Sequence, residues 1–441
     1  MGKIGFVSIS HQDYLEENVA VMTRRALEEC RHTGHTIIAA DCIVTNSTIA
    51  RKTGIDFAAS DLDGVVVLFG GWMECPVAMS LLREIEHLPL CVWGFPMFET
   101  EGQRNSTGSY VSYAMFKGVL DRVGWKYIGL LGSIDLDKSV FERLSAFCAA
   151  ADSKQKLKRC KIGLVGYTSM SIYTGTFDHV LMRTIIGPEI EHIDGYTLIQ
   201  MAEHASDEEK KTAIDKFAKA AKIDKKISPE ILEKTAGVYC GLKKCIDDRH
   251  LDGINVKCQY EFSKEYKCVP CVPLSLLADE GVIASCEGDI LCTVSMAILR
   301  FLSQSVTAYG DAMHHFDNTV KLSSCGFIPF SMGVEDRKVC NFLPHPGFTG
   351  IQPSFVLRPQ KVTVLRLIEG IGDYKILYFT GQGLETDLRQ GYMPALDIKL
   401  DGDIRNLIEN YAGQHYAICY GDVSSKIEAL SKIMGIKAIR V

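Results

Sequence analysis

Apolar and polar positions alternate in two different ways along this chain. In the first three quarters, short apolar runs such as Gly64 to Leu68 and Lys161 to Val165 are separated by amphipathic segments such as Glu16 to Cys30. Strands that alternate with segments of helical period predict βαβ units around parallel sheets. From Arg358 to Thr380, apolar and polar residues alternate one by one across a glycine-rich turn. That second pattern predicts an antiparallel hairpin with one buried face.

The two patterns together predict an α/β protein. We expect two successive βαβ domains of the Rossmann or flavodoxin-like kind with parallel sheets, followed by a small antiparallel β domain. A charged, lysine-rich stretch at residues 151–158 suggests the first join. The expected domains are therefore residues 1–150, 151–332 and 333–441, and a chain of 441 residues has room for two or three.

Composition narrows the class of protein. A net charge of −6 with both signs mixed argues against a nucleic-acid-binding surface. The 16 cysteines are scattered through apolar segments, and Cys268 and Cys271 form a single CxxC without a second pair. We interpret them as reduced core thiols rather than disulfides or a zinc site. With no signal peptide and no apolar stretch long enough for a membrane span, we expect a cytoplasmic protein with no membrane partner.

The most promising chemistry lies between Gly281 and Met332. An apolar strand passes through the turn Cys286-Glu287-Gly288-Asp289 into an apolar helix that starts near Ile290. Ligands of open α/β sheets bind beyond the carboxyl ends of the strands, which is where Glu287 lies. Asp311 follows just before His314 and His315. Two converging carboxylates with imidazoles nearby can hold a divalent cation or share acid and base work.

A structural reading of these acids stands beside the functional one. Acidic residues in the first turn of a helix are stabilised by the helix dipole, so Glu287 and Asp289 could serve only to start the helix at Ile290. The local pattern alone favours this simpler reading.

A wider resemblance favours the functional reading of these acids over the structural one. Ser285 to Asp289, followed by a helix, an aspartate and a strand ending in Ser324-Cys325-Gly326, resembles the C-terminal half of the L-fucose isomerase and L-arabinose isomerase superfamily. Gln414 to Asp422 is similar to the superfamily's last histidine-containing strand, and Ser424 to Gly435 to its last helix. The resemblance covers about residues 161–441. It implies an enzyme that interconverts an aldose and a ketose through a cis-enediol, assembled as a homo-oligomer, a trimer or hexamer.

The resemblance also assigns residues. Its two metal-binding acids fall on Glu287 and Asp311, and its metal-binding histidine falls on His415. The two acids would also be the proton-transferring pair, although which is base and which is acid stays open. Such a ligand set suits Mn²⁺ or Mg²⁺. Three further positions are candidate sugar contacts: Trp72, Tyr167 and Asp178. A loop tryptophan such as Trp72 can equally cover the edge of a core.

One departure leaves the substrate open. Ser324 stands where many relatives have a histidine, which removes a possible fourth ligand, and His314, His315 and His345 are alternatives that could approach the site. Fucose-, arabinose- and sulfoquinovose-type sugars all occur among enzymes of this kind. The alternative function is a non-catalytic cytoplasmic sugar-binding protein, because two βαβ domains with a cleft between them also describe periplasmic-type binding proteins.

Overall fold

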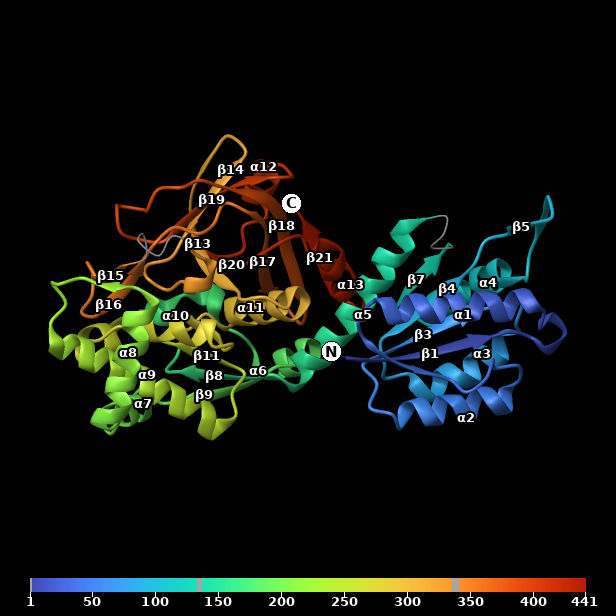
Figure 1. Ribbon diagram of the computed structural model, residues 1–441, viewed down its shortest axis with the longest axis horizontal. Helices are drawn as coiled ribbons and strands as arrows, with labels where there is room; N and C mark the ends of the chain where they lie inside the picture. Colours follow the sequence, from blue (N-terminus) through green and yellow to red (C-terminus); the bar gives the residue numbers. More distant parts are fainter. Residues whose placement is uncertain (1, 133–136, 335–340) are drawn as a thin grey trace. The chain divides into compact units, whose positions relative to one another are not determined.

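The computed structural model describes residues 2–132, 137–334 and 341–441, which contacts divide into two compact units (Figure 1). Unit 1 comprises Met1–Lys156 and Ser425–Ile436, and unit 2 comprises Leu157–Ser424 and Lys437–Val441. The chain therefore leaves unit 1 and comes back to it for one segment near its end. The three domain limits expected from the sequence stay predictions.

Unit 1 contains a five-stranded parallel sheet in the order β2-β1-β3-β4-β7. The strands are β1 (Lys3–Ile9), β2 (Thr36–Ala39), β3 (Gly64–Phe69), β4 (Leu90–Gly94) and β7 (Tyr127–Leu131), with a small hairpin of β5 (Phe98–Thr100) and β6 (Gln103–Asn105). The helices are α1 (Glu17–His32), α2 (Ser47–Ala58), α3 (Cys75–Leu82), α4 (Ser109–Arg122), α5 (Lys138–Arg159) and α13 (Ser424–Met434). This strand order is that of flavodoxin-like sheets.

The sheet of unit 1 is buried on both faces, as its continuous apolar strands predict. All six residues of β3 are buried. On one face, Val65 and Val67 lie in a single core cluster with Phe57 of α2 and Leu81 of α3. Residues 151–158, expected as a join, instead form the end of helix α5. Their lysines belong to a helix whose other positions, such as Leu157, are buried. The division between the two units falls within this stretch, between Lys156 and Leu157.

Unit 2 begins with a four-stranded parallel sheet in the order β12-β11-β8-β9. Its strands are β8 (Lys161–Val165), β9 (Glu189–Ile193), β11 (Gly253–Val256) and β12 (Ile283–Cys286). The helices are α6 (His179–Leu181), α7 (Gly195–Glu203), α8 (Asp207–Ala220), α9 (Pro229–Arg249), α10 (Cys271–Asp279) and α11 (Ile290–Ser303), with π-helical turns at Met182–Ile186 and Cys258–Glu265. The sheet's four carboxyl ends meet at one edge, where Glu287 follows β12.

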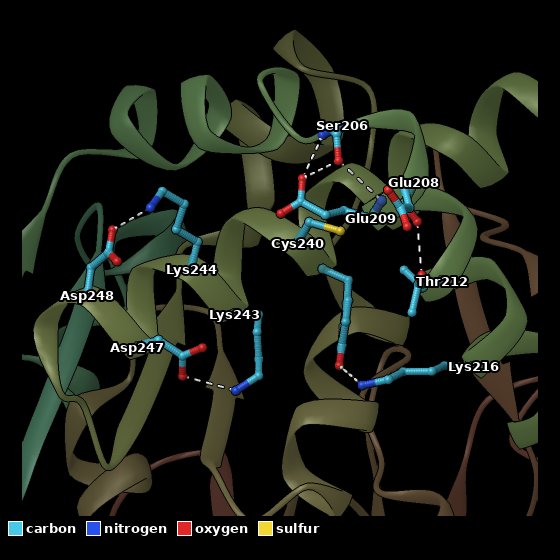
Figure 2. Close-up of a pocket in the computed structure, with 12 residues that line it drawn as sticks. Ser206, Glu208, Glu209, Thr212, Lys216, Cys240, Lys243, Lys244, Asp247 and Asp248 are labelled. Carbon is cyan, nitrogen blue, oxygen red and sulfur yellow. Dashed lines mark hydrogen bonds and ion pairs between the residues drawn. The ribbon is translucent and has the colours of Figure 1, made fainter.

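The charged region between β9 and β11 is helical, and capping residues mark where its helices begin. Ser206 and Glu209 form a reciprocal capping box at the start of α8, and Ser228 caps α9 ahead of Pro229. Figure 2 shows that charged side chains over α8 and α9 pair with one another, for example Lys243 with Asp247 at 3.0 Å. Exposed pairs of this kind describe a solvated helix surface.

The remaining strands of unit 2 form a seven-stranded sheet in the order β17-β20-β13-β14-β19-β18-β21, in which β17 also pairs with β18. The strands are β13 (Ala308–Phe316), β14 (Thr319–Ser323), β17 (Lys361–Glu369), β18 (Tyr374–Leu384), β19 (Ala395–Leu400), β20 (His415–Tyr420) and β21 (Lys437–Arg440), with α12 at Ile404–Glu409. A small separate sheet contains β10 (Lys222–Ile223), β15 (Asn341–Pro344) and β16 (Ile351–Ser354). Because β17 pairs on both sides, six of the strands close into a barrel, which removes exposed edges.

A mixed α/β chain with parallel sheets and an antiparallel C-terminal β region is therefore confirmed. β13 and β14 pair in the antiparallel sheet, so Asp311 lies in the barrel, although it falls within residues 151–332, the range expected for the second α/β domain. The helix α11 that precedes them is continuous with the βαβ pattern, and nothing local marks the change of sheet.

The structure also bears on the expectations about cysteines and membrane spans. Every cysteine that the structure describes is a free thiol; Cys91, Cys268 and Cys271 are buried, whereas Cys42 is exposed. Within the described ranges, no helix is both long and apolar enough to cross a membrane.

Candidate active site

Three elements far apart in the sequence bring Glu287, Asp311 and His415 together. Glu287 follows β12, Asp311 lies in β13 and His415 opens β20. In the antiparallel pairing of β13 with β20, Asp311 is directly opposite His415, so their side chains leave the same face of the sheet. Helix α11 packs against β20 and β17, and this packing holds the end of β12 beside them.

His415 lies between the two acids predicted with it. Its Nε2 atom is 3.4 Å from Oε2 of Glu287 and 3.3 Å from Oδ1 of Asp311. His415 is fully buried, Glu287 is 6% exposed and the Asp311 side chain is 24% exposed. Asp311 is thus the member of the cluster most open to solvent. The three predicted ligands meet, while their roles in metal binding and catalysis stay predictions.

The backbone at Glu287 is held in an unfavourable conformation. Glu287 has φ +68°, in the left-handed region that side chains other than glycine rarely adopt. Its N–H donates to the Val256 carbonyl and its carbonyl accepts from the Ser169 N–H, each at 3.0 Å. The next residue, Gly288, also has φ +68°, and a Cβ there would lie 2.2 Å from the Tyr167 carbonyl oxygen. Strained positions held in this way cluster at functional sites.

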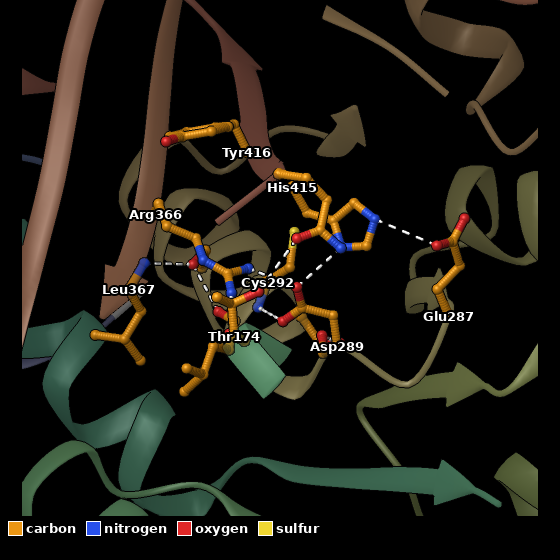
Figure 3. A network of polar contacts seen from close by, with 12 residues as sticks. Thr174, Glu287, Asp289, Cys292, Arg366, Leu367, His415 and Tyr416 are labelled. Carbon is orange, nitrogen blue, oxygen red and sulfur yellow. Dashed lines mark hydrogen bonds and ion pairs between the residues drawn. The ribbon is translucent and has the colours of Figure 1, made fainter. Parts of the chain in front are cut away.

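Asp289 has a part in this site that sequence reasoning missed. Its Oδ1 caps α11 by accepting from the Cys292 N–H at 2.8 Å, as expected for a helix start. Its Oδ2 is 2.9 Å from Nδ1 of His415 and 2.8 Å from a nitrogen of Arg366, as Figure 3 shows. A carboxylate on one ring nitrogen fixes the orientation of a histidine and presents the other nitrogen to a ligand. Asp289 therefore aims Nε2 of His415 at Glu287 and Asp311.

Arg366 completes this buried network from β17. The side chains of Arg366 and Asp289 are 0% and 1% exposed. Arg366 also donates to the carbonyl of Thr174. Removing either charge from such a pair leaves the other buried without compensation, which is costly. The network ties β12, α11 and β17 to the histidine of β20.

Charge in the cluster is set by burial and by these contacts. Burial raises the pKa of Glu287, but its contact with the His415 ring and the charge of that ring outweigh this effect, so the pKa lies below its usual value. Burial lowers the pKa of His415, yet its three carboxylate neighbours raise it well above the usual value. The carboxylates around His415 therefore favour the protonated form of its ring.

The donor set suits a divalent cation such as Mn²⁺ or Mg²⁺. As they stand, no three histidine, cysteine or acidic side chains in the described part of the chain are placed to hold a metal ion. However, Nε2 of His415 is buried and has no well-formed hydrogen bond. Its 3.3 and 3.4 Å separations from the two acids are close to the spacing of about 3 Å between neighbouring ligands of a six-coordinate cation with bonds of about 2.1 Å. Loss of the His415 proton would make the set a two-carboxylate, one-imidazole site.

Ser324 and Cys325 lie beside the cluster. Ser324 is buried, and its hydroxyl has no hydrogen-bond partner among the described residues. The Cys325 thiol donates to Oε1 of Glu287 at 3.4 Å. His345 approaches from the other side and contacts the Cys325 carbonyl through Nε2 at 3.1 Å. His314 and His315 are exposed on β13, beyond an irregularity in its pairing with β14, and lie on the far part of that strand.

His345 makes stability sensitive to acid. Burial lowers the pKa of His345 from 6.5 to about 4, although its contact with the Cys325 carbonyl acts in the opposite direction. Its Nδ1 accepts from two backbone N–H groups, which requires the neutral ring. Between pH 6.5 and about 4, His345 is therefore protonated in the unfolded chain but neutral in the folded chain. The free energy of unfolding that is present above pH 6.5 decreases as the pH falls toward 4.

We expect His345 to account for about 2 kcal/mol of lost stability between pH 7.5 and pH 5. Urea unfolding at both pH values measures it for the wild type and for His345→Asn, whose side-chain oxygen can replace Nδ1 as acceptor. His345→Asn is expected to lose less stability than the wild type over this interval. An equal loss in the two proteins would contradict the assignment.

The structure places the three candidate sugar contacts differently. Tyr167 follows β8, is 62% exposed and lies over the Lys257 ammonium. Asp178 is exposed and caps α6 by accepting from the Leu181 N–H at 2.8 Å. Trp72 belongs to unit 1, where its ring packs near those of His11 and Tyr14, each with centroids 5.7 Å away. Tyr167 thus lies next to the turn that carries Glu287. Asp178, in contrast, caps a helix.

Comparison with known proteins supports the resemblance. No protein-family model matches the chain. Proteins named sulfoquinovose isomerase are similar along its length: that of Alkalicoccus urumqiensis is 23% identical, covering 80% of this chain and 81% of the relative. The protein of Priestia aryabhattai is 21% identical over 98% and 97%, and that of Clostridium sp. (strain MSTE9) 25% over 68% and 69%.

Solved structures add no argument. A solute-binding protein of an ABC transporter from Burkholderia multivorans matches 69% of this chain and 94% of its own, with 10% identity and a TM-score of 0.20. A periplasmic sugar-binding protein from Legionella pneumophila covers 69% and 97%, with 11% identity and a TM-score of 0.20.

The sequence relatives span nearly the whole chain, and its motifs follow the order of the resemblance described above. The expected class of enzyme, an aldose–ketose isomerase, is confirmed by these relatives. These relatives therefore support the resemblance of this chain to the superfamily of fucose and arabinose isomerase-like sugar isomerases.

Proposed function

We propose that the protein is a metal-dependent isomerase of sulfoquinovose or a closely similar sugar. It would move a proton between C1 and C2 through a cis-enediolate. The observation that carries the proposal is the meeting of Glu287, Asp311 and His415 from three separate elements, with Nε2 of the histidine within 3.4 Å of both acids. The substrate is taken from the printed names of the relatives.

A divalent cation, Mn²⁺ or Mg²⁺, held by Glu287, Asp311 and His415 would supply Lewis-acid stabilisation of the enediolate charge. The protein's own part is proton transfer and positioning. Glu287 and Asp311 form the pair that takes the proton from one carbon and returns it to the other. Asp289 keeps the His415 ring oriented, and the Cys325 thiol restrains the free oxygen of Glu287.

Two further expectations, about sugar contacts and about oligomeric state, are part of this proposal. Trp72 and Asp178 stay predicted sugar contacts, and assembly as a trimer or hexamer stays a prediction from the resemblance. The Trp72 ring, packed with those of His11 and Tyr14, has the aromatic character that binds the apolar faces of sugars.

The test is proton exchange measured by NMR. Purified protein is incubated in D₂O with sulfoquinovose and Mn²⁺, which is removed before spectra are recorded, or with a chelator. We expect a ketose product that carries deuterium at C1, and its loss in the presence of the chelator. Glucose, which lacks the sulfonate, serves as the control sugar. Exchange that survives the chelator would remove metal dependence, and exchange on glucose but not on sulfoquinovose would remove the proposed substrate.

A further inference from the structure

Lys257 is a buried cation at the same edge of the sheet as Glu287. It follows β11, and only 4% of its side chain is exposed. Its ammonium lies 3.5 Å from the centre of the Tyr167 ring and 2.8 Å from Oε1 of Glu261. A buried ammonium is expensive, so a lysine in such a place calls for a reason.

Two tyrosines accompany this cation with their rings in solvent. Tyr167 is 62% exposed, and Tyr260, whose ring centre is 6.0 Å from the Lys257 ammonium, is 45% exposed. We name Tyr167, Lys257 and Tyr260 the lysine–tyrosine cluster. Exposed aromatic rings around one ammonium provide both apolar faces for a sugar and a positive charge for an anion.

The backbone of the cluster is strained. Tyr260 has φ +71° and ψ −72°, an outlier for a bulky side chain, and lies within the π-helical turn Cys258–Glu265. The turn is anchored by the Ser263 hydroxyl, which accepts from the Tyr260 N–H at 3.0 Å. Strain and π-helical turns recur at ligand sites because the fold must hold a side chain where regular structure would not.

The cluster adjoins the candidate active site. Strands β11 and β12 are hydrogen-bonded neighbours in which Val256 is opposite Cys286, so Lys257 and Glu287 follow paired residues. Neighbouring strands are only about 4.8 Å apart. From β8, the Tyr167 carbonyl meets Gly288 so closely that no side chain fits there. The lysine–tyrosine cluster and Glu287 therefore follow neighbouring strands at one edge of the sheet.

We propose that the lysine–tyrosine cluster binds the sulfonate of the substrate, an inference that rests on the proposed function. Lys257 donates charge-assisted hydrogen bonds to the sulfonate oxygens, and the tyrosine rings border the carbon chain that carries it. This assigns Lys257 as a residue that determines specificity for anionic over neutral sugars. It takes no part in proton transfer.

When no sugar is bound, the Glu261 carboxylate forms an ion pair with the Lys257 ammonium. Its side chain is 37% exposed, and its Oε2 is buried without a hydrogen-bond partner among the described residues. A sulfonate displaces the carboxylate from Lys257, and the glutamate turns toward solvent. Glu261 therefore competes with the substrate, so its removal strengthens binding. This gives two neighbouring variants opposite expected effects.

The test compares sulfoquinovose with its neutral counterpart quinovose, which lacks the sulfonate. Lys257→Met is expected to raise KM for sulfoquinovose about 10- to 100-fold, with kcat nearly unchanged, because one charge-assisted contact is lost. Its KM for quinovose stays within about twofold of the wild-type value. Glu261→Gln lowers KM for sulfoquinovose by about threefold, the effect of removing a partly exposed competing charge. Lys264→Met is the matched control, because Lys264 also faces the Tyr260 ring but is exposed.

Calorimetric binding of sulfoquinovose to the chelator-treated protein separates this inference from the proposed function. Lys257-dependent binding, together with no turnover of sulfoquinovose by the protein supplied with Mn²⁺, upholds the inference and removes the isomerase proposal. Turnover with Lys257→Met indistinguishable from Lys264→Met overturns the inference alone. Neither binding nor turnover of sulfoquinovose overturns both. If Lys257→Met does not fold, an unchanged or raised KM in Glu261→Gln overturns the inference.

Discussion

Replacing Glu287 by glutamine is expected to lower kcat for sulfoquinovose about 1,000-fold. Glutamine has nearly the same shape, but it accepts no proton and is a weak ligand for a divalent cation. Because Glu287 is one of the three proposed ligands, the variant should also bind Mn²⁺ less tightly. Product formation followed by NMR measures kcat, and calorimetry measures Mn²⁺ and sugar binding separately.

Glu409→Gln is the control for this experiment, since Glu409 is an exposed residue at the end of α12. Circular dichroism and urea unfolding establish that both variants are folded. Sugar binding is expected to survive in Glu287→Gln, because the lysine–tyrosine cluster is untouched. Turnover within tenfold of the wild type would exclude Glu287 from proton transfer and would leave Asp311 to act with another group.

Replacing Arg366 by methionine is expected to destabilise the protein by about 3 to 5 kcal/mol. The methionine fills much of the same volume but removes the arginine charge from the buried Asp289 carboxylate, which keeps only the His415 ring beside it. Urea unfolding measures the change in the free energy of unfolding. Arg405→Met is the matched control, because the Arg405 side chain is 84% exposed beside Asp403 and its pair should contribute less than about 1 kcal/mol.

A second variant tests the cause. In Arg366→Met combined with Asp289→Asn, the uncompensated charge is absent while the amide oxygen can still cap α11. The double variant should therefore be less destabilised than the sum of the two single variants, with a coupling of about 1 to 3 kcal/mol. Additive effects would mean that the arginine acts through packing rather than through the charge of Asp289.

Much of the fold was readable from the sequence because local signals agreed with the final structure. The apolar run after Asp289 predicted α11 to within one residue, and the alternation around Arg358 to Thr380 predicted the β17–β18 hairpin. The capping residues of α8 and α9 are local signals of the same kind. These signals depend on neighbours in sequence, and for that reason they survive without knowledge of tertiary contacts.

The active-site network was only partly readable. Glu287, Asp311 and His415 were named by the resemblance, while their meeting depends on the pairing of β13 with β20, about 100 residues apart, which no local pattern encodes. Arg366 has a signal in retrospect: it shares its strand face with Val362 and Val364, which are buried, so a charge there needed a buried partner. The sequence predicted Asp289 only as a helix cap, which it is. Its second carboxylate oxygen contacts His415 and Arg366, and no local pattern predicts these contacts.

The divided make-up of unit 1 has a consequence for synthesis. Its sheet and first five helices are complete by about residue 156, but α13 is encoded after residue 424, a separation of 424 − 156 = 268 residues. At ribosomal rates of about 5 to 20 residues per second, the nascent unit waits on the order of tens of seconds for that helix. Until then, the surface of unit 1 that packs against the buried residues of α13 stays uncovered. Those residues are Ile427, Leu430 and Ile433. Fragments cut at the first crossing between the units would inherit the same uncovered surface, so an expression strategy for unit 1 alone needs α13 fused back to it.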